Sequence, residues 1–302
     1  MPFEGFKTKV HKKPVRTAKR LPLHPKDAAY RALNLLQNDR LSDMQRALLE
    51  VLMTAGALTT TQLQSLLPIS RRSLRRYYLD YLIDHHTAPF SLRQFEMPKH
   101  FRELRLYSLG SIGRAWLDWQ NLTYPTYEGY QVQQLTHDVL CNEIVLALRC
   151  AMAQSNQQVS WYGKAEAQVY SADSRDTNRL LEPDAMLIAK DKRQQAMVVE
   201  FHNETHRNRT AEKVERYERI ARTEAWRASW PIDTFPLVLV VSHKKTVMDG
   251  YTDALTAYQP RGLACTYLGK PLQHILERRQ IDSWVDLRTG RRIQLWKRQV
   301  KG

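Results

Sequence analysis

The chain has 302 residues, enough for two domains or one large one, and 43% of them are apolar, which excludes an intrinsically disordered protein. Lysine and arginine outnumber aspartate and glutamate by 46 to 31, which gives a formal net charge of +15. Such an excess attracts polyanions, because neutralised phosphates release their counterions, so nucleic acid is the expected class of partner.

Cysteine spacing and the apolar runs argue against several other classes. Cys141, Cys150 and Cys265 form no CxxC pair, so neither a disulfide framework nor a zinc ribbon is expected. No apolar run approaches the length of a membrane span, and no apolar signal core follows the basic N-terminus. We therefore expect a cytoplasmic protein without a membrane partner.

The N-terminal part of the chain predicts a basic arm followed by helices. Residues 1–26 are basic and poor in apolar side chains, which indicates a flexible arm that either follows phosphates or is simply solvated. The segment DAAYRALNLLQ then has helical apolar spacing. Three more helices are expected, over about 42–54, between Thr59 and Pro68, and from Ser70 to about 83.

An alternating segment follows these helices. In PFSLRQFEMPKHFRELRLYSLG the apolar residues recur with period two, which predicts a hairpin with strands near 90–97 and 102–108. The segment SIGRAWLDWQ is then expected to be helical. Three helices followed by a hairpin are typical of a winged helix-turn-helix, so we predict such a DNA-binding domain over 27–120.

The last helix before the hairpin carries the arginines expected to contact DNA. Leu74, Tyr78, Leu79 and Leu82 are expected to face inward, which leaves the arginines outside. Arginine near the start of a recognition helix can read guanine, and other arginines can hold phosphates. The predicted DNA-binding residues are Ser70, Arg71, Arg72, Arg75, Arg76, Arg93, Lys99 and Arg102. The alternative is a winged domain that contacts protein.

The second half of the chain has a different pattern. A Tyr- and Gln-rich linker at 121–135 and a basic tail at 276–302 would flank an α/β domain at 136–275 with a central mixed sheet. The expected elements are a helix at 136–154, strands near 159–170, 184–190 and 196–201, a helix at 207–227, a strand at 236–242, a helix at 246–258 and a strand at 263–267. The whole chain is thus predicted to be an α+β multidomain protein.

Two carboxylates are expected at one edge of this sheet. Asp184 opens one strand and Glu200 ends the next, so neighbouring strands would bring them together. Such an oxygen-rich site suits Mg²⁺ or Mn²⁺, which can activate water or stabilise the charge on a cleaved phosphodiester. The alternative is that both acids form ion pairs with Arg207 or Arg209.

Other side chains could complete this predicted site. Lys213 on the following helix is the best cation to assist the developing charge, and Tyr217 lies one helical turn further along the same face. Glu143 and Glu166 could complete the acidic set. Hydrolytic cleavage and a covalent link through a side chain such as Tyr217 both stay open. His137 begins a helix, where a lone histidine is more often a cap or a packed side chain than a ligand.

The arrangement of Asp184 and Glu200 resembles that of PD-(D/E)xK nucleases. That pattern has lysine two residues after the second acid, and His202 stands there in this chain. Some members of that superfamily carry the lysine on the neighbouring helix, where Lys213 could replace it. Since histidine is a poorer cation than lysine at neutral pH, His202 puts cleavage in question.

Five segments in order carry a resemblance to the replication-relaxation family. They are LYSLGSIGRAWL (106–117), THDVLCNEIVLAL (136–148), EPDAMLI (182–188), VVEFHNET (198–205) and KVERY (213–217). The family joins a winged helix-turn-helix to a degenerate restriction-endonuclease-like domain and includes MobC-type plasmid mobilisation relaxases. The resemblance implies action on plasmid or mobile-element DNA, with Asp184 and Glu200 as metal-binding acids and Lys213 as their basic partner.

Three functions remain open from the sequence. The first is a metal-dependent DNA nickase or relaxase that acts at a transfer or replication origin. The second is a non-catalytic accessory or regulatory protein of the relaxosome, of replication or of transcription. Both would bind double-stranded DNA, beside other relaxosome proteins or a coupling protein, and a homodimer is among the alternatives. The third, from charge and tyrosine content alone, is an RNA-binding protein.

Overall fold

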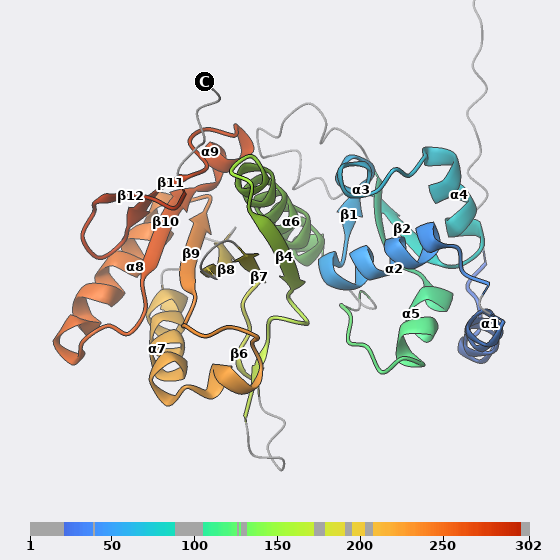
Figure 1. Ribbon diagram of the computed structural model, residues 1–302, viewed down its shortest axis with the longest axis horizontal. Coiled ribbons are helices and arrows are strands. Elements are labelled where there is room, and N and C mark those ends of the chain that lie inside the picture. Colours follow the sequence, from blue (N-terminus) through green and yellow to red (C-terminus); the bar gives the residue numbers. More distant parts are fainter. Residues whose placement is uncertain are drawn as a thin grey trace, which may run out of the picture.

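The computed structural model shows an N-terminal unit of helices with a small sheet, packed beside a C-terminal unit built on a large sheet (Figure 1). The structure describes residues 21–38, 40–87, 105–125, 127, 132–171, 179–190, 195–202 and 208–296. Most of the predicted arm, the strand predicted at 90–97 and three predicted DNA-binding residues lie outside these ranges, namely Arg93, Lys99 and Arg102.

The helices of the N-terminal unit begin at polar side chains that cap them. Ser42 and Thr59 each form a capping box with the glutamine three residues later, and Ser70 accepts a hydrogen bond from the Ser73 amide at 3.0 Å. The helices are α1 (Pro25–Gln37), α2 (Asp43–Ala55), α3 (Thr60–Leu66), α4 (Arg71–Leu79) and α5 (Ser111–Asp118). Beside them lies an antiparallel sheet of β1 (Leu58–Thr59), β3 (Arg105–Leu109) and β2 (Ile83–Thr87), in that order.

Helix α4 ends earlier than the sequence predicts. It stops at Leu79, because the chain turns at Tyr81, whose φ is +62°, and enters β2 directly. Leu74 and Tyr77 are the buried residues of α4. Of the residues expected to face inward, Tyr78 is partly buried and packs against the core, whereas the expectation for Leu79 was wrong, since that side chain is exposed.

The large sheet has the strand order β12–β11–β10–β9–β8–β7–β4. Strands β8, β9 and β10 run parallel, whereas the pairs on either side of them are antiparallel, so the sheet is mixed as predicted. The strands are β4 (Gln158–Gly163), β7 (Ala185–Lys190), β8 (Gln195–His202), β9 (Leu237–Ser242), β10 (Tyr267–Pro271), β11 (Ser283–Asp286) and β12 (Arg292–Gln294). A separate pair joins β5 (Val169–Tyr170) and β6 (Arg179–Leu181).

Helices cover both faces of the large sheet. Strand β8 alternates between them: Val199 and Phe201 pack against α6 (Val132–Ala153) and α9 (Leu272–Leu276), while Val198 packs against α7 (Asn208–Thr223) and α8 (Lys245–Tyr258). Short 3₁₀ turns, at Ala225–Ala228 and Gln259–Arg261, follow α7 and α8. None of the helices in the described ranges combines the length and apolar composition that a membrane crossing requires.

Several further predicted boundaries differ from the observed elements: the strand predicted near 159–170 is split into β4 and β5, and the strand predicted at 263–267 is β10, four residues later. Strands β11 and β12 come from the segment predicted as a tail at 276–302, yet they extend the sheet, and Trp284 on β11 is 1% exposed. These strands are short and lie among arginines, so they give little periodic signal. Helix α6 begins at Val132, inside the segment predicted as a linker at 121–135.

Polar contacts join the two units along α6 and β4. The side-chain amide of Asn142 on α6 donates to the carbonyl oxygens of Ala55 and Ala57, at 2.8 and 2.9 Å. These bonds satisfy backbone acceptors where α2 ends. On β4, the chain at Gly163 passes so close to α2 that a methyl group added at Gly163 would lie 1.6 Å from the backbone carbonyl oxygen of Thr54.

Gly163→Ala is therefore expected to force α2 and β4 apart. We expect a loss of about 3 kcal/mol of unfolding free energy, the upper part of the range for overpacked sites, measured by urea denaturation. The matched control is Gly290→Ala, because Gly290 has a φ of +70° but a methyl group added there would meet no atom within 4 Å. The control should lose about 1 kcal/mol from backbone strain alone. Equal losses in the two variants would contradict the close approach.

Candidate functional site

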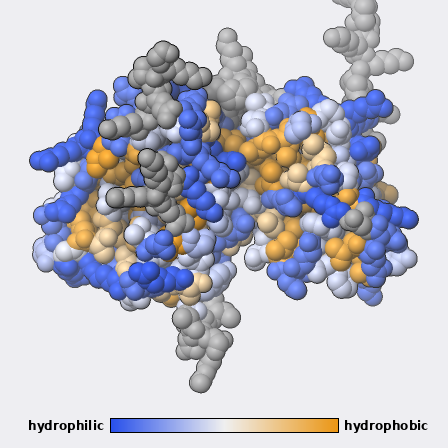
Figure 2. Space-filling view, viewed as in Figure 1, coloured by the Kyte–Doolittle hydropathy of each residue, from blue (hydrophilic) through white to orange (hydrophobic). Residues whose placement is uncertain are grey.

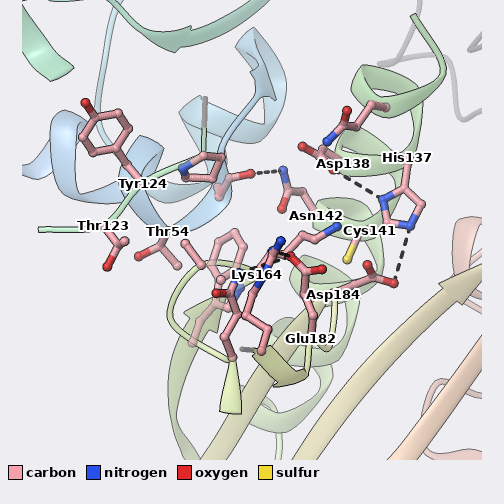
Figure 3. Close-up of a pocket in the computed structure, with 18 residues that line it drawn as sticks. Thr54, Thr123, Tyr124, His137, Asp138, Cys141, Asn142, Lys164, Glu182 and Asp184 are labelled. Carbon is pink, nitrogen blue, oxygen red and sulfur yellow. Dashed lines mark hydrogen bonds and ion pairs between the residues drawn. The ribbon is translucent and has the colours of Figure 1, made fainter. Parts of the chain in front are cut away.

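A cavity of about 420 Å³ lies where the two units meet, at the end of the sheet where β7 begins (Figure 3). Helix α2 of the N-terminal unit and helix α6, strand β4 and the start of β7 all contribute to its wall. Its charged lining residues are His137, Asp138, Lys164, Arg179, Glu182 and Asp184. The cavity therefore includes Asp184, one of the two acids singled out in the sequence.

Asp184 forms an ion pair with a histidine from α6. Its Oδ2 accepts a hydrogen bond from the Phe201 amide at 2.8 Å and lies 3.4 Å from Nε2 of His137. In Figure 3 the two side chains point toward one another, and Nδ1 of His137 lies 3.3 Å from Asp138. The sequence left His137 as a cap or packed side chain, and the structure makes it the partner of the predicted metal ligand.

Electrostatic forces keep this pair charged. Burial by itself would lower the pKa of His137, but the carboxylates of Asp184 and Asp138 outweigh it and raise that pKa to about 10. Burial also opposes ionisation of Asp184, yet His137, with Lys213, holds the pKa of that carboxyl well below its usual range. At neutral pH the pair is therefore an imidazolium beside a carboxylate.

Glu200 is held by two side chains from α7. It is 1% exposed; Lys213 Nζ lies 2.6 Å from its Oε2, and the Tyr217 hydroxyl donates to its Oε1 at 2.5 Å. Burial would lower the pKa of Lys213, but Glu200 and Asp184 raise it. Burial and Glu200 both raise the pKa of Tyr217. Tyr217 is fully buried, and its hydroxyl group stays protonated while it donates a hydrogen bond to Glu200. Its oxygen is therefore not placed to attack a phosphate.

The structure places the remaining predicted site residues elsewhere. Nε2 of His202, buried two residues beyond Glu200, lies 2.9 Å from the Tyr251 hydroxyl on α8. Glu143 pairs with Arg278 on another side of α6, and Glu166 accepts from the Gly163 amide at 2.9 Å within its own turn. Neither Glu143 nor Glu166 lines the cavity of Asp184.

Both predicted metal-binding acids are contacted by the protein's own cations. A Mg²⁺ ion is usually held by one or two carboxylates together with waters and substrate phosphates. Both oxygens of Glu200 already accept hydrogen bonds, and Asp184 is neutralised by His137. Within the described ranges, no group of three or more histidine, cysteine, aspartate or glutamate side chains is arranged to hold a metal.

A second candidate surface is the arginine cluster of α4, which consists of Arg71, Arg72, Arg75 and Arg76. All four side chains are exposed, and the surface in the region of α4 is strongly hydrophilic (Figure 2). Arg76 lies over the ring of Tyr77 at 5.1 Å. Considering only described residues, Arg72, Arg75 and Arg76 form no ion pair with an acid. Their charge is therefore available to an external anion.

The ion pair of His137 makes the stability of the fold decrease as the pH becomes alkaline. The pKa of His137 is about 10 in the folded state and 6.5 in the unfolded state. Its charge therefore stabilises the fold fully below pH 6.5, and this contribution disappears as the pH rises toward 10. The unfolding free energy should fall across that window, and it should fall less in His137→Gln. The measurement is urea denaturation over the window. An imidazole NMR titration of His137 that centres near 6.5 would contradict the pair.

Lys213→Met tests whether Lys213 compensates the negative charge of the buried Glu200. Removing one partner of a buried pair leaves an uncompensated charge, so we expect a loss of about 3 kcal/mol, at the low end for such pairs because Lys213 is 28% exposed. The matched control is Arg216→Met on the same helix, which breaks an exposed pair with Glu212 and should cost less than about 1 kcal/mol. Thermal or urea denaturation measures both, and equal losses would refute the buried pair.

Comparison with known proteins identifies the family. A family model described as Replication-relaxation matches residues 49–233, well over half of the chain. The matched region contains the arginine cluster of α4, both acids and Lys213. No curated protein and no solved structure matches the chain significantly. The chain belongs to the replication-relaxation family.

Proposed function

We propose that this chain is a duplex-DNA-binding protein of plasmid replication or mobilisation, and that its α/β unit does not cleave DNA. Membership of the replication-relaxation family supports the plasmid context. The observation that carries the DNA-binding part is the arginine cluster of α4, exposed at the start of a helix that Ser70 caps. Double-stranded DNA at a plasmid origin is the proposed partner, beside other relaxosome proteins.

The order of elements in the N-terminal unit supports a winged helix-turn-helix. Helices α2, α3 and α4 are followed by the antiparallel pair β2 and β3, and β1 joins β3 from the other side. In such domains the helix before the hairpin enters the major groove. Helix α4 is then the recognition helix. The segment between β2 and β3, with Arg93, Lys99 and Arg102, lies outside the described residues.

Helix α4 has the dimensions and charge for this role. An α-helix with its side chains is about 10–12 Å across, which matches the major groove, about 12 Å wide. Arg72 lies three residues before Arg75 and four before Arg76, so these guanidinium groups share one face of the helix. The first free amides of α4 also attract a phosphate. One face can therefore read bases while the helix start holds the backbone.

The order of elements in the C-terminal unit supports a nuclease-like ancestry. Helix α6 precedes the antiparallel strands β4, β7 and β8, and α7 then leads to β9, parallel to β8. Asp184 and Glu200 stand at adjacent ends of β7 and β8, as in the PD-(D/E)xK arrangement. Because His137 contacts Asp184 and both oxygens of Glu200 accept hydrogen bonds from Lys213 and Tyr217, we propose that the fold has persisted without its chemistry.

Substitution of the arginine cluster tests DNA binding. Arg72→Ala and Arg75→Ala should each weaken binding to the cognate duplex, selected from a random pool and measured by fluorescence anisotropy at several salt concentrations. An arginine that reads guanine should cost about 1–3 kcal/mol and relax specificity, and one that holds a phosphate should lower the salt slope by about 1. The matched control is Arg219→Ala, an exposed arginine on α7. Unchanged affinity in both α4 variants would refute the assignment.

A nicking assay tests the non-catalytic part of the proposal. Supercoiled plasmid that carries the selected site should stay supercoiled in the presence of Mg²⁺ or Mn²⁺. Asp184→Ala should retain DNA affinity, provided that circular dichroism shows a folded protein. Nicking that depends on the metal and is lost in Asp184→Ala and Glu200→Ala would instead establish a metal-dependent nickase.

A further inference from the structure

A second groove lies on the same junction between the units, away from Asp184. Its volume is about 500 Å³, and its walls come from α3, from the C-terminal half of α6 and from the start of β4. Ser65 and Leu66 line it from α3, Arg149 and Cys150 from α6, and Arg278 from the segment after α9. The groove therefore borders the helix that immediately precedes α4.

Arg149 gives this groove an uncompensated positive charge. Its guanidinium lies over the ring of Trp161, 5.7 Å from the ring centroid, and burial lowers its pKa. In the described ranges it forms no ion pair, whereas Arg278 in the same groove is paired with Glu143. A partly desolvated cation without a counter-charge is stabilised by an anion that enters beside it.

We propose that this groove binds a backbone phosphate of the same DNA duplex that α4 contacts, with Arg149 as the cation. The proposal rests on the proposed function, since it extends the DNA interface from the N-terminal unit onto α6. An arginine held over an aromatic ring presents its outer N–H groups in a restricted geometry, which suits an oxyanion.

The short distance along the chain allows one duplex to contact both helix α4 and the groove. Leu66 in the groove and Arg71 at the start of α4 are five residues apart, so their Cα atoms are separated by at most about 18 Å. Duplex DNA advances 3.4 Å per base pair, so about five base pairs cover that distance. A phosphate about half a turn from the bases read by α4 can therefore lie at the α3 edge of the groove.

Arg149→Gln tests the charge. It should weaken binding several-fold for every duplex tested and lower the slope of log affinity against log salt by about 1, without changing sequence preference. Arg219→Gln on α7 makes the same charge change away from the groove and should leave affinity unchanged. Matching unfolding midpoints of the two variants exclude a folding defect. An unchanged affinity and slope in Arg149→Gln overturn the proposal.

Cys150 supplies a test in the wild-type protein. It is an exposed free thiol in the groove, whereas Cys141 and Cys265 are buried. A saturating concentration of duplex should slow the alkylation of Cys150 by N-ethylmaleimide several-fold. In Arg75→Ala this protection should vanish at DNA concentrations below the dissociation constant of that variant. Alkylation that DNA does not slow overturns the proposal, as would be expected if the groove took an acidic peptide instead.

The two proposals fail in different ways. Suppose that Arg75→Ala weakens binding, that Arg149→Gln leaves affinity unchanged, and that DNA does not slow the alkylation of Cys150. The groove is then not part of the interface, and α4 remains the DNA-binding helix. If the wild-type protein does not bind duplex DNA, both proposals are refuted.

Discussion

Helix α6 is the element on which both units depend. Its Asn142 completes the hydrogen bonding of the backbone where α2 ends, and its Val139 carbonyl accepts a bond from Gln62 of α3 at 3.0 Å. Its other face closes the core of the large sheet. Because buried polar groups lose their water on folding, each must find its partner across the junction. This requirement fixes how the helices of the N-terminal unit are oriented on the sheet.

The same helix determines the state of the acidic pair. His137 on α6 approaches Asp184 from one side, and Lys213 on α7 approaches Glu200 from the other. These ion pairs connect the sheet to helices on its two faces, α6 and α7.

Local chemistry explains why some of the fold was predictable. The caps at Ser42, Thr59 and Ser70 define helix starts through the chain's nearest neighbours, and the apolar strands β7, β8 and β9 stand out by composition. The end of α4 depends instead on the backbone turn at Tyr81. The short strands β11 and β12 form because β10 offers an edge to pair with, which a sequence pattern does not record.

The sequence by itself determined the excess of positive charge, the arginine cluster of α4, the capped helices and the placement of Asp184 and Glu200 on neighbouring strands. These depend on residue type, on the period of the backbone and on adjacency along the chain. Only the tertiary structure decided that His137 neutralises Asp184, that Glu143 belongs to another site, and that Arg149 borders a groove beside α3. Those outcomes depend on distances between residues far apart in the chain, because electrostatic forces act through space.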